Sequence, residues 1–212
     1  MGGAAALVMG ANAQAAASGF YAGLEAGATW IERSDVLETR NTGATAFHDR
    51  IDYDTGWALL ATLGYEWNHW RVEGEIGYRQ NDMQSLRTTI FTTKGVDNLD
   101  QLTLMANVLY DIPLGDRFSA TLGAGVGADR ISFDWPGFSS NGWSDDNWVF
   151  AWQGIVGLNY ALSPDCDLFV DYRYLSASGP DYAIDVVTIY TLDFDDVVTH
   201  TASVGVRWHF SP

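Results

Sequence analysis

The stretch Val204-Gly205-Val206-Arg207-Trp208-His209-Phe210 decides the fold of this 212-residue chain. Apolar side chains alternate with small or polar ones, and the stretch ends on an aromatic ring. A period of two is typical of a β-strand whose two faces meet different surroundings. In the last strand of an outer-membrane β-barrel, one face meets lipid and the other meets a polar interior. The stretch therefore predicts a membrane-spanning strand, with the apolar face turned to lipid.

The same alternation recurs along the chain from Phe20 onward. Each segment has roughly ten residues, the length that crosses a bilayer when the strand is tilted. The predicted strands cover residues 20–30, 57–67, 70–79, 102–112, 118–129, 148–162, 167–175 and 198–210. An even number of such strands predicts an all-β fold, an eight-stranded antiparallel up-and-down transmembrane β-barrel.

The predicted connections alternate between short and long. Short ones cover residues 68–69, 113–117 and 163–166, and long ones cover residues 31–56, 80–101, 130–147 and 176–197. Outer-membrane barrels have short periplasmic turns and long extracellular loops. This alternation predicts that both ends of the barrel domain lie on the periplasmic side.

Large aromatic residues are expected in two girdles at the ends of the lipid-facing strands. The residues assigned to these girdles are Trp30, Trp57, Trp67, Trp70, Trp148, Trp208 and Phe210. Aromatic rings favour the membrane–water interface. A soluble eight-stranded barrel such as a lipocalin is the alternative, but its apolar residues would face inward. Aromatic rings at both ends of the apolar face favour the membrane barrel.

Composition agrees with a membrane barrel and narrows the classes of partner. The chain has nine Trp, ten Tyr, ten Phe and 22 Gly. Its net charge of −16 argues against nucleic-acid binding, which needs a basic surface. Cys166, the single cysteine, cannot form an internal disulfide.

The N-terminus predicts an export signal, with residues 1–15 as a signal-peptide remnant that is cleaved. An apolar core at residues 4–8 precedes small residues that offer cleavage after Ala13 or Ala15. A disordered Ala/Gly tail is the alternative. Residues 16–212 then form a single barrel domain.

Several motifs, taken in order, resemble the Gram-negative small outer-membrane β-barrel family of OmpA-like and opacity-type porins. These motifs occupy residues 20–23, 105–111, 122–127, 152–160, 171–175 and 205–210. The resemblance implies an outer-membrane location in a Gram-negative bacterium and insertion by the barrel-assembly machinery. The sequence departs from the family pattern at Ser211-Pro212, since such barrels usually end on the aromatic residue.

Charged residues on the inward faces must be paired, because a buried charge without a partner is costly. We expect an ion-pair network inside the barrel that consists of Glu25, Glu75, Asp171, Arg173 and Arg207. Eight strands leave an interior just wide enough for side chains. The network is therefore predicted to fill the lumen, and a gate for small ions is the alternative.

Neither catalysis nor a cofactor is expected from the sequence. The four histidines do not assemble with a nucleophile, and His200 and Ser203 have opposite parity on their strand. Acidic residues in segments 130–147 and 176–197 could hold divalent cations, but no EF-hand spacing occurs and no metal site is assigned.

The sequence thus predicts a structural and surface-interaction barrel, and a narrow porin-like channel is the alternative. The expected partners are outer-membrane lipid and lipopolysaccharide, the assembly machinery, and an extracellular ligand or surface that contacts the four long loops. Haem binding and lipid A modification have less support in the residues.

Overall fold

The computed structural model describes residues 18–32, 35–40, 45–87, 92–133, 147–178, 190–194 and 196–210. The predicted signal remnant at residues 1–15 and the dipeptide Ser211-Pro212 lie outside these residues. In the described ranges, no helix is long and apolar enough to cross a membrane.

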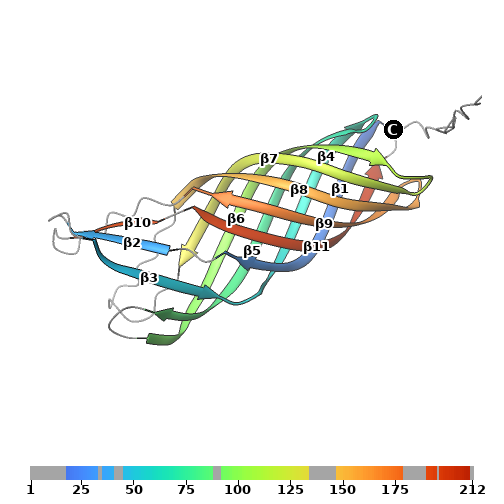
Figure 1. Ribbon diagram of the computed structural model, residues 1–212. Helices are drawn as coiled ribbons and strands as arrows, with labels where there is room; N and C mark the ends of the chain where they lie inside the picture. Colours follow the sequence, from blue (N-terminus) through green and yellow to red (C-terminus); the bar gives the residue numbers. More distant parts are fainter. Residues whose placement is uncertain are drawn as a thin grey trace, which may run out of the picture.

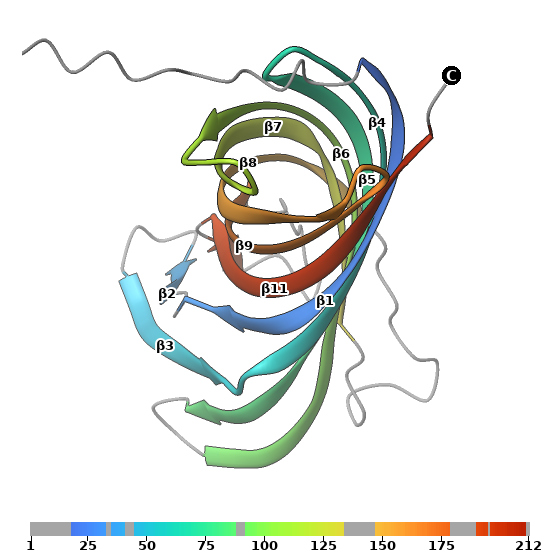
Figure 2. The same ribbon diagram turned by 90° about the vertical axis from the view of Figure 1, so that its right-hand side faces the viewer.

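Eight strands form a closed antiparallel barrel, as Figures 1 and 2 show. They are β1 (Gly19–Ile31), β4 (Gly56–Trp67), β5 (Trp70–Arg87), β6 (Thr92–Pro113), β7 (Phe118–Phe133), β8 (Asn147–Ser163), β9 (Cys166–Ala177) and β11 (Val197–Phe210). Each strand pairs with the next one in this order, and β1 pairs with both β4 and β11, which closes the ring. The predicted eight-stranded barrel is confirmed.

The alternation in the sequence corresponds to two different surfaces of the barrel wall. On β1, the outward Leu24 side chain is 49% exposed, whereas the next residue, Glu25, is 2% exposed inside. This distribution inverts that of a soluble barrel, because the apolar side chains cover the outside and the charged ones lie within.

Tight turns join the barrel strands at one end. The β4–β5 turn consists of Asn68 and His69, and Asn68 has a φ of 53°. Asn tolerates this left-handed conformation better than most residues, and a two-residue hairpin of this type requires it. The β8–β9 turn consists of Pro164 and Asp165.

Strands also extend beyond the other end of the barrel. The pairing of β5 with β6 continues to Arg87 and Thr92. Three further strands lie there, β2 (Asp35–Arg40), β3 (Thr45–Tyr53) and β10 (Tyr190–Phe194), in the order β10-β2-β3-β5 (Figure 1). The prediction of loops over residues 31–56, 80–101, 130–147 and 176–197 is therefore wrong in part, because each of these segments contains strand residues; β7, for example, continues to Phe133.

The lumen has two zones along its length. Charged and polar side chains predominate in the middle and at the end with the short turns, where Leu60, Leu109, Ile155 and Phe169 are also buried. Towards the other end lies an apolar cluster of inward side chains from six strands: Ile31, Leu99, Met105, Ile131, Ala151, Leu175, Ala177 and Val197. Polar and apolar packing thus follow one another along the barrel axis.

Candidate functional site

The centre of the lumen is organised around Arg173 on β9. Its guanidinium donates two hydrogen bonds to the Glu25 carboxylate on β1, at 2.6 and 2.7 Å. Ser203 on β11 donates a further hydrogen bond to Glu25 at 2.6 Å. The Arg173 and Glu25 side chains are both about 2% exposed or less, so this bidentate pair has little contact with solvent.

Two more carboxylates surround the same guanidinium. Glu75 lies 3.4 Å from Arg173 Nε, and Asp171 lies 3.4 Å from Arg173 Nη1. The Glu75 carboxylate also accepts hydrogen bonds from Asn107 at 2.9 Å and Gln153 at 3.2 Å. Four of the five residues assigned to the network thus meet at the centre of the barrel.

Arg207, the fifth assigned residue, does not join this cluster. It lies opposite Asp167 in the β9–β11 register, whereas Arg173 lies opposite Thr201. Six residues separate positions 201 and 207 along β11, which corresponds to about 20 Å of strand. The Arg207 guanidinium instead pairs with Asp167 at 3.4 Å and stacks over the Phe169 ring at 4.9 Å.

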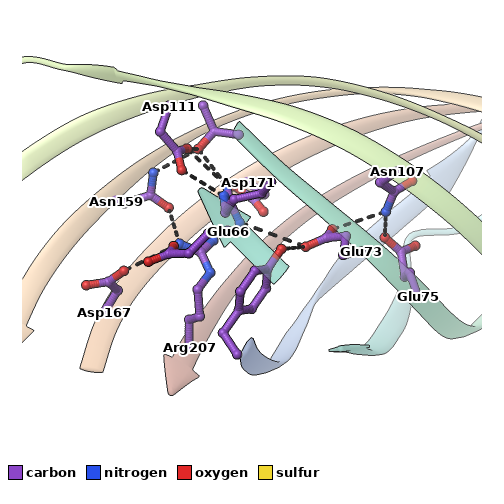
Figure 3. A network of polar contacts seen from close by, with 12 residues as sticks. Glu66, Glu73, Glu75, Asn107, Asp111, Asn159, Asp167, Asp171 and Arg207 are labelled. Atoms are coloured by element: carbon purple, nitrogen blue, oxygen red, sulfur yellow. Dashed lines mark hydrogen bonds and ion pairs between the residues drawn. The ribbon is translucent and has the colours of Figure 1, made fainter. Parts of the chain in front are cut away.

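A second polar cluster fills the lumen nearer the short turns (Figure 3). Arg71 binds the Asp111 carboxylate through two hydrogen bonds of 2.7 and 3.0 Å. Tyr21, which has no exposed surface, donates a hydrogen bond to Glu73 at 2.7 Å. The guanidinium groups of Arg71 and Arg207 both lie over the Tyr21 ring, at 5.7 and 5.4 Å from its centroid.

His209 lies between two carboxylates, at the edge of this cluster nearest the short turns. Its Nε2 is 2.9 Å from Asp167, and its Nδ1 is 3.3 Å from Glu66. Figure 3 shows Glu66, Asp167 and Arg207 close together at the end of the network. A polar cavity of about 330 Å³ opens beside them and is lined by the short turns.

Arg79 connects the central cluster to the apolar zone. It has no exposed surface and donates hydrogen bonds to Thr103 at 2.9 Å and Thr201 at 3.1 Å. Further towards the end with the long connections, Gln101 donates a hydrogen bond to Asp129 at 2.9 Å. Beyond this pair most inward side chains are apolar, with Asn81 and Thr199 buried among them.

Several buried polar atoms in the lumen have no hydrogen-bond partner within the described ranges, although some of them belong to ion pairs. These atoms are Glu75 Oε1, Arg79 Nη2, Asn81 Oδ1, Asp129 Oδ1, Gln153 Oε1, Asp171 Oδ1 and Arg173 Nε. Buried polar atoms of this kind are ordinarily satisfied by water or an ion. The polar zone therefore has the chemistry of a hydrated interior.

All seven residues assigned to the aromatic girdles lie on the outer surface of the barrel wall. Trp67, Trp70, Trp208 and Phe210 lie near the short turns, and Trp30, Trp57 and Trp148 lie near the opposite end. Their exposed fractions run from 37% for Trp30 and Trp67 to 54% for Phe210.

Sequence reasoning missed one polar cluster on the outer wall. His200 has the outward parity of its strand but is 8% exposed, because aromatic rings cover it. The Trp30 ring stacks on it at 5.6 Å, and the Tyr172 hydroxyl lies 2.6 Å from Nδ1. Its Nε2 lies 2.8 Å from Glu32. A histidine among apolar outward residues was the only signal of this cluster in the sequence.

No described group of three or more His, Cys, Asp or Glu side chains is arranged to hold a metal ion. The segments 134–146 and 179–195, which contain all but Asp196 of the acidic residues considered for divalent cations, lie outside the residues whose side chains are described. The structure therefore does not bear on those loops.

Comparisons with known proteins identify the family. A family model described as outer membrane protein beta-barrel domain matches residues 2–210. The chain belongs to this family, and the protein is located in the outer membrane. Parts of the sequence also resemble an uncharacterized protein of Brucella abortus, at 34% identity over 86 residues; this match covers 36% of the chain and only 30% of the relative.

Solved structures of small outer-membrane barrels share the fold. Neisserial surface protein A (NspA) is 20% identical with a TM-score of 0.57, and the match covers 92% of this chain and 99% of that one. OprG from Pseudomonas aeruginosa is 17% identical with a TM-score of 0.59, covering 92% and 98%. AlkL is 20% identical with a TM-score of 0.54, covering 92% of each chain. At these identities the likeness concerns the fold alone.

Proposed function

We propose that this protein is a structural and surface-interaction barrel of the outer membrane, with a lumen closed by its own side chains. The packing of the lumen is the observation that supports this role best. Arg79, Asp129, Gln153 and Thr199 all have no exposed surface, although each points into the barrel. A wide aqueous pore would leave such side chains in contact with solvent.

The closure has two different physical components. The central charges are held by ion pairs in which Arg173 faces Glu25, Glu75 and Asp171. Above them, the apolar side chains around Leu99 and Ile131 are buried, and they narrow the lumen beside the polar side chains of Asn81 and Gln101. An ion would have to lose its hydration shell in both zones.

The part of the protein that contacts a partner is proposed to be the extension beyond the barrel. The hairpin of β5 and β6, together with β2, β3 and β10, projects from the end with the long connections. A rigid barrel that carries longer segments at one end is a common arrangement for binding. The periplasmic end offers only short turns.

Conductance across a planar lipid bilayer tests the closed lumen. The unmutated protein is expected to give no steady open level at any holding potential within the range that the bilayer withstands. A stable single-channel current from the unmutated protein would overturn the proposal of a closed lumen.

A narrow channel is the second candidate, because one observation favours it. The buried atoms without a hydrogen-bond partner in the described lumen, such as Asp171 Oδ1 and Asn81 Oδ1, are sites at which water molecules can bind. A chain of water through the polar zone would reach the apolar cluster and stop there. Conductance that appears only after Leu99→Ala and Ile131→Ala would indicate that this cluster is the barrier, and would support closure in the unmutated protein.

The proposal includes no enzymatic step. The hydroxyl–imidazole–carboxylate contacts of Tyr172, His200 and Glu32 lie on the outer wall, and Ser203 faces the interior, where it donates to Glu25. Mass spectrometry of lipid A from cells that overproduce the protein is expected to find no trimmed or added acyl chain. Modified lipid A that depends on His200 would contradict this part of the proposal.

A further inference from the structure

The outer wall carries a built polar site at its end opposite the short turns. His200 is more than nine-tenths buried there, under Trp30, Tyr172 and Tyr174. Both ring nitrogens have partners, Tyr172 at 2.6 Å and Glu32 at 2.8 Å. A polar group on a lipid-facing wall is costly unless it is hydrogen-bonded, and these contacts satisfy it.

The site also exposes one acceptor. The Glu32 side chain is 58% exposed and is the outermost member of the cluster, one residue beyond the end of β1. It therefore reaches the level of lipid headgroups, above the Trp30 ring. Its carboxylate can accept hydrogen bonds from hydroxyl or amide groups of a sugar headgroup.

An apolar groove of about 670 Å³ begins directly below this cluster. Small side chains, Ala26 and Ala202, line it, and larger ones flank it: Val156, Val170, Tyr172 and Val204. Tyr172 belongs to both features, since its ring lines the groove and its hydroxyl contacts His200. Ala202 lies two residues from His200 on β11, so the groove begins one outward row below the polar cluster. From there it crosses β1, β11, β9 and β8 at the level of Ala202 to Val204.

We infer that this groove holds an acyl chain of an outer-leaflet lipopolysaccharide molecule, with its sugar headgroup against Glu32. The groove lies on a membrane-facing wall, so hydrocarbon must cover it. The polar cluster lies at the headgroup end of the groove. A groove without this cluster would offer a lipid headgroup no polar contact. The end with the long connections faces outward in such barrels, so the lipid is one of the outer leaflet. A second convex barrel would not reach the alanines between their larger neighbours.

The test uses the full-length protein purified in detergent, with purified lipid A as the probe and native mass spectrometry as the readout. Ala202→Leu and, separately, Ala26→Leu fill the groove. Ala106→Leu is the matched control, because Ala106 lines a different groove of about 580 Å³ on the β4–β7 side of the wall. Heat-modifiable migration establishes that each variant forms the barrel.

The unmutated protein and Ala106→Leu are expected to retain one lipid A molecule per chain. Both groove-filling variants are expected to bind lipid A with about tenfold lower affinity. Glu32→Ala, which leaves the groove open and removes the hydrogen-bond acceptor, is expected to weaken retention of lipid A.

Three results would overturn the inference. Equal retention of lipid A by Ala202→Leu, Ala26→Leu and the unmutated protein would remove the groove as the site. Equal retention of lipid A and phosphatidylethanolamine by the unmutated protein would show that the sugar headgroup is not recognised. A dimer that Ala202→Leu dissociates would identify a second copy of the chain as the occupant.

Discussion

Arg173 is the residue on which the charge balance of the central lumen depends. It lies within 3.4 Å of Glu25, Glu75 and Asp171, and the exposed fractions of these four side chains do not exceed 6%. Three carboxylates in such a space repel one another when the guanidinium is absent. Parity assigned Glu25, Glu75, Asp171 and Arg173 to the interior, but the sequence also assigned Arg207 to this cluster. Arg207 pairs with Asp167 instead, because its height depends on the register between strands.

Arg173→Ala is expected to lower the free energy of unfolding by about 3–5 kcal/mol, because it leaves buried carboxylates without their cation. Urea titration followed by the shift from compact to unfolded migration on unboiled gels measures this value. Arg117→Ala, at the exposed turn between β6 and β7, makes the same chemical change and is expected to cost within about 0.5 kcal/mol. Equal losses in the two variants would mean that the central ion pairs contribute nothing.

Gly64 provides the space that the buried Tyr21 ring occupies. The two residues are direct partners in the β1–β4 register, and a Cβ at position 64 would lie 2.4 Å from the ring. Gly64→Ala is therefore expected to destabilise the barrel by about 1–3 kcal/mol through displacement of the ring. Gly74→Ala is the control, since a Cβ there meets nothing within 4 Å. If both variants unfold at the same urea concentration, the ring does not need this space.

At the scale of the elements, the sequence predicted strands best where lipid imposes the alternation. The segment 70–79 was identified, but β5 continues to Arg87 and β6 begins at Thr92. In residues 80–87, polar side chains such as Gln80, Asn81 and Asp82 follow one another, so no period of two is visible. Beyond the membrane both faces of a strand meet water, and nothing requires alternate residues to be apolar. The same reason explains why β2, β3 and β10 were not predicted.

Replacement of residues 33–53, which contain β2 and β3, by a linker of about four residues is expected to leave the barrel folded. The β1–β4 ladder runs from Gly19 to Thr29 without them. The Asn81 amide also donates hydrogen bonds of 3.0 Å to the carbonyls of Thr29 and Asp54, which holds the two strand ends together. Heat-modifiable migration in lipid vesicles measures the outcome. If these strands carry the proposed contact region, binding to an extracellular ligand or surface should fall in parallel.

A variant that loses the compact gel band would contradict this prediction, since it would make β2 and β3 part of the folding unit. Unchanged surface binding by a folded variant would instead remove β2 and β3 from the proposed contact region. Migration and binding are separate measurements, so the two outcomes can be distinguished.

At the scale of the whole molecule, the barrel has a direction in the membrane. The short turns, the polar cavity of about 330 Å³ and the clusters around Arg71 and His209 lie at one end. The long connections, the extra strands and the apolar zone of the lumen lie at the other. By the rule for outer-membrane barrels, the first end faces the periplasm.

Labelling of Cys166 tests this orientation, since β9 begins with this residue directly after a short turn. A membrane-impermeant maleimide is expected to leave Cys166 unlabelled in intact cells and to label it after the outer membrane is permeabilised. In a Cys166→Ser background, Ser178→Cys places a thiol at the exposed outer end of β9 and should react in intact cells. Reaction of Cys166 in intact cells would reverse the assigned orientation.

The bond between Glu25 and its partners has a consequence for the order of assembly. Glu25 lies on the first strand, and the groups that bind its carboxylate come from the last two, 148 and 178 residues later in the chain. A chain that stops before β9 would therefore carry an early carboxylate with neither its cation nor its hydroxyl. The cation is present only once β9 has been synthesised, and the hydroxyl only once β11 has, so the full set of contacts to Glu25 forms only in a chain that contains the last two barrel strands.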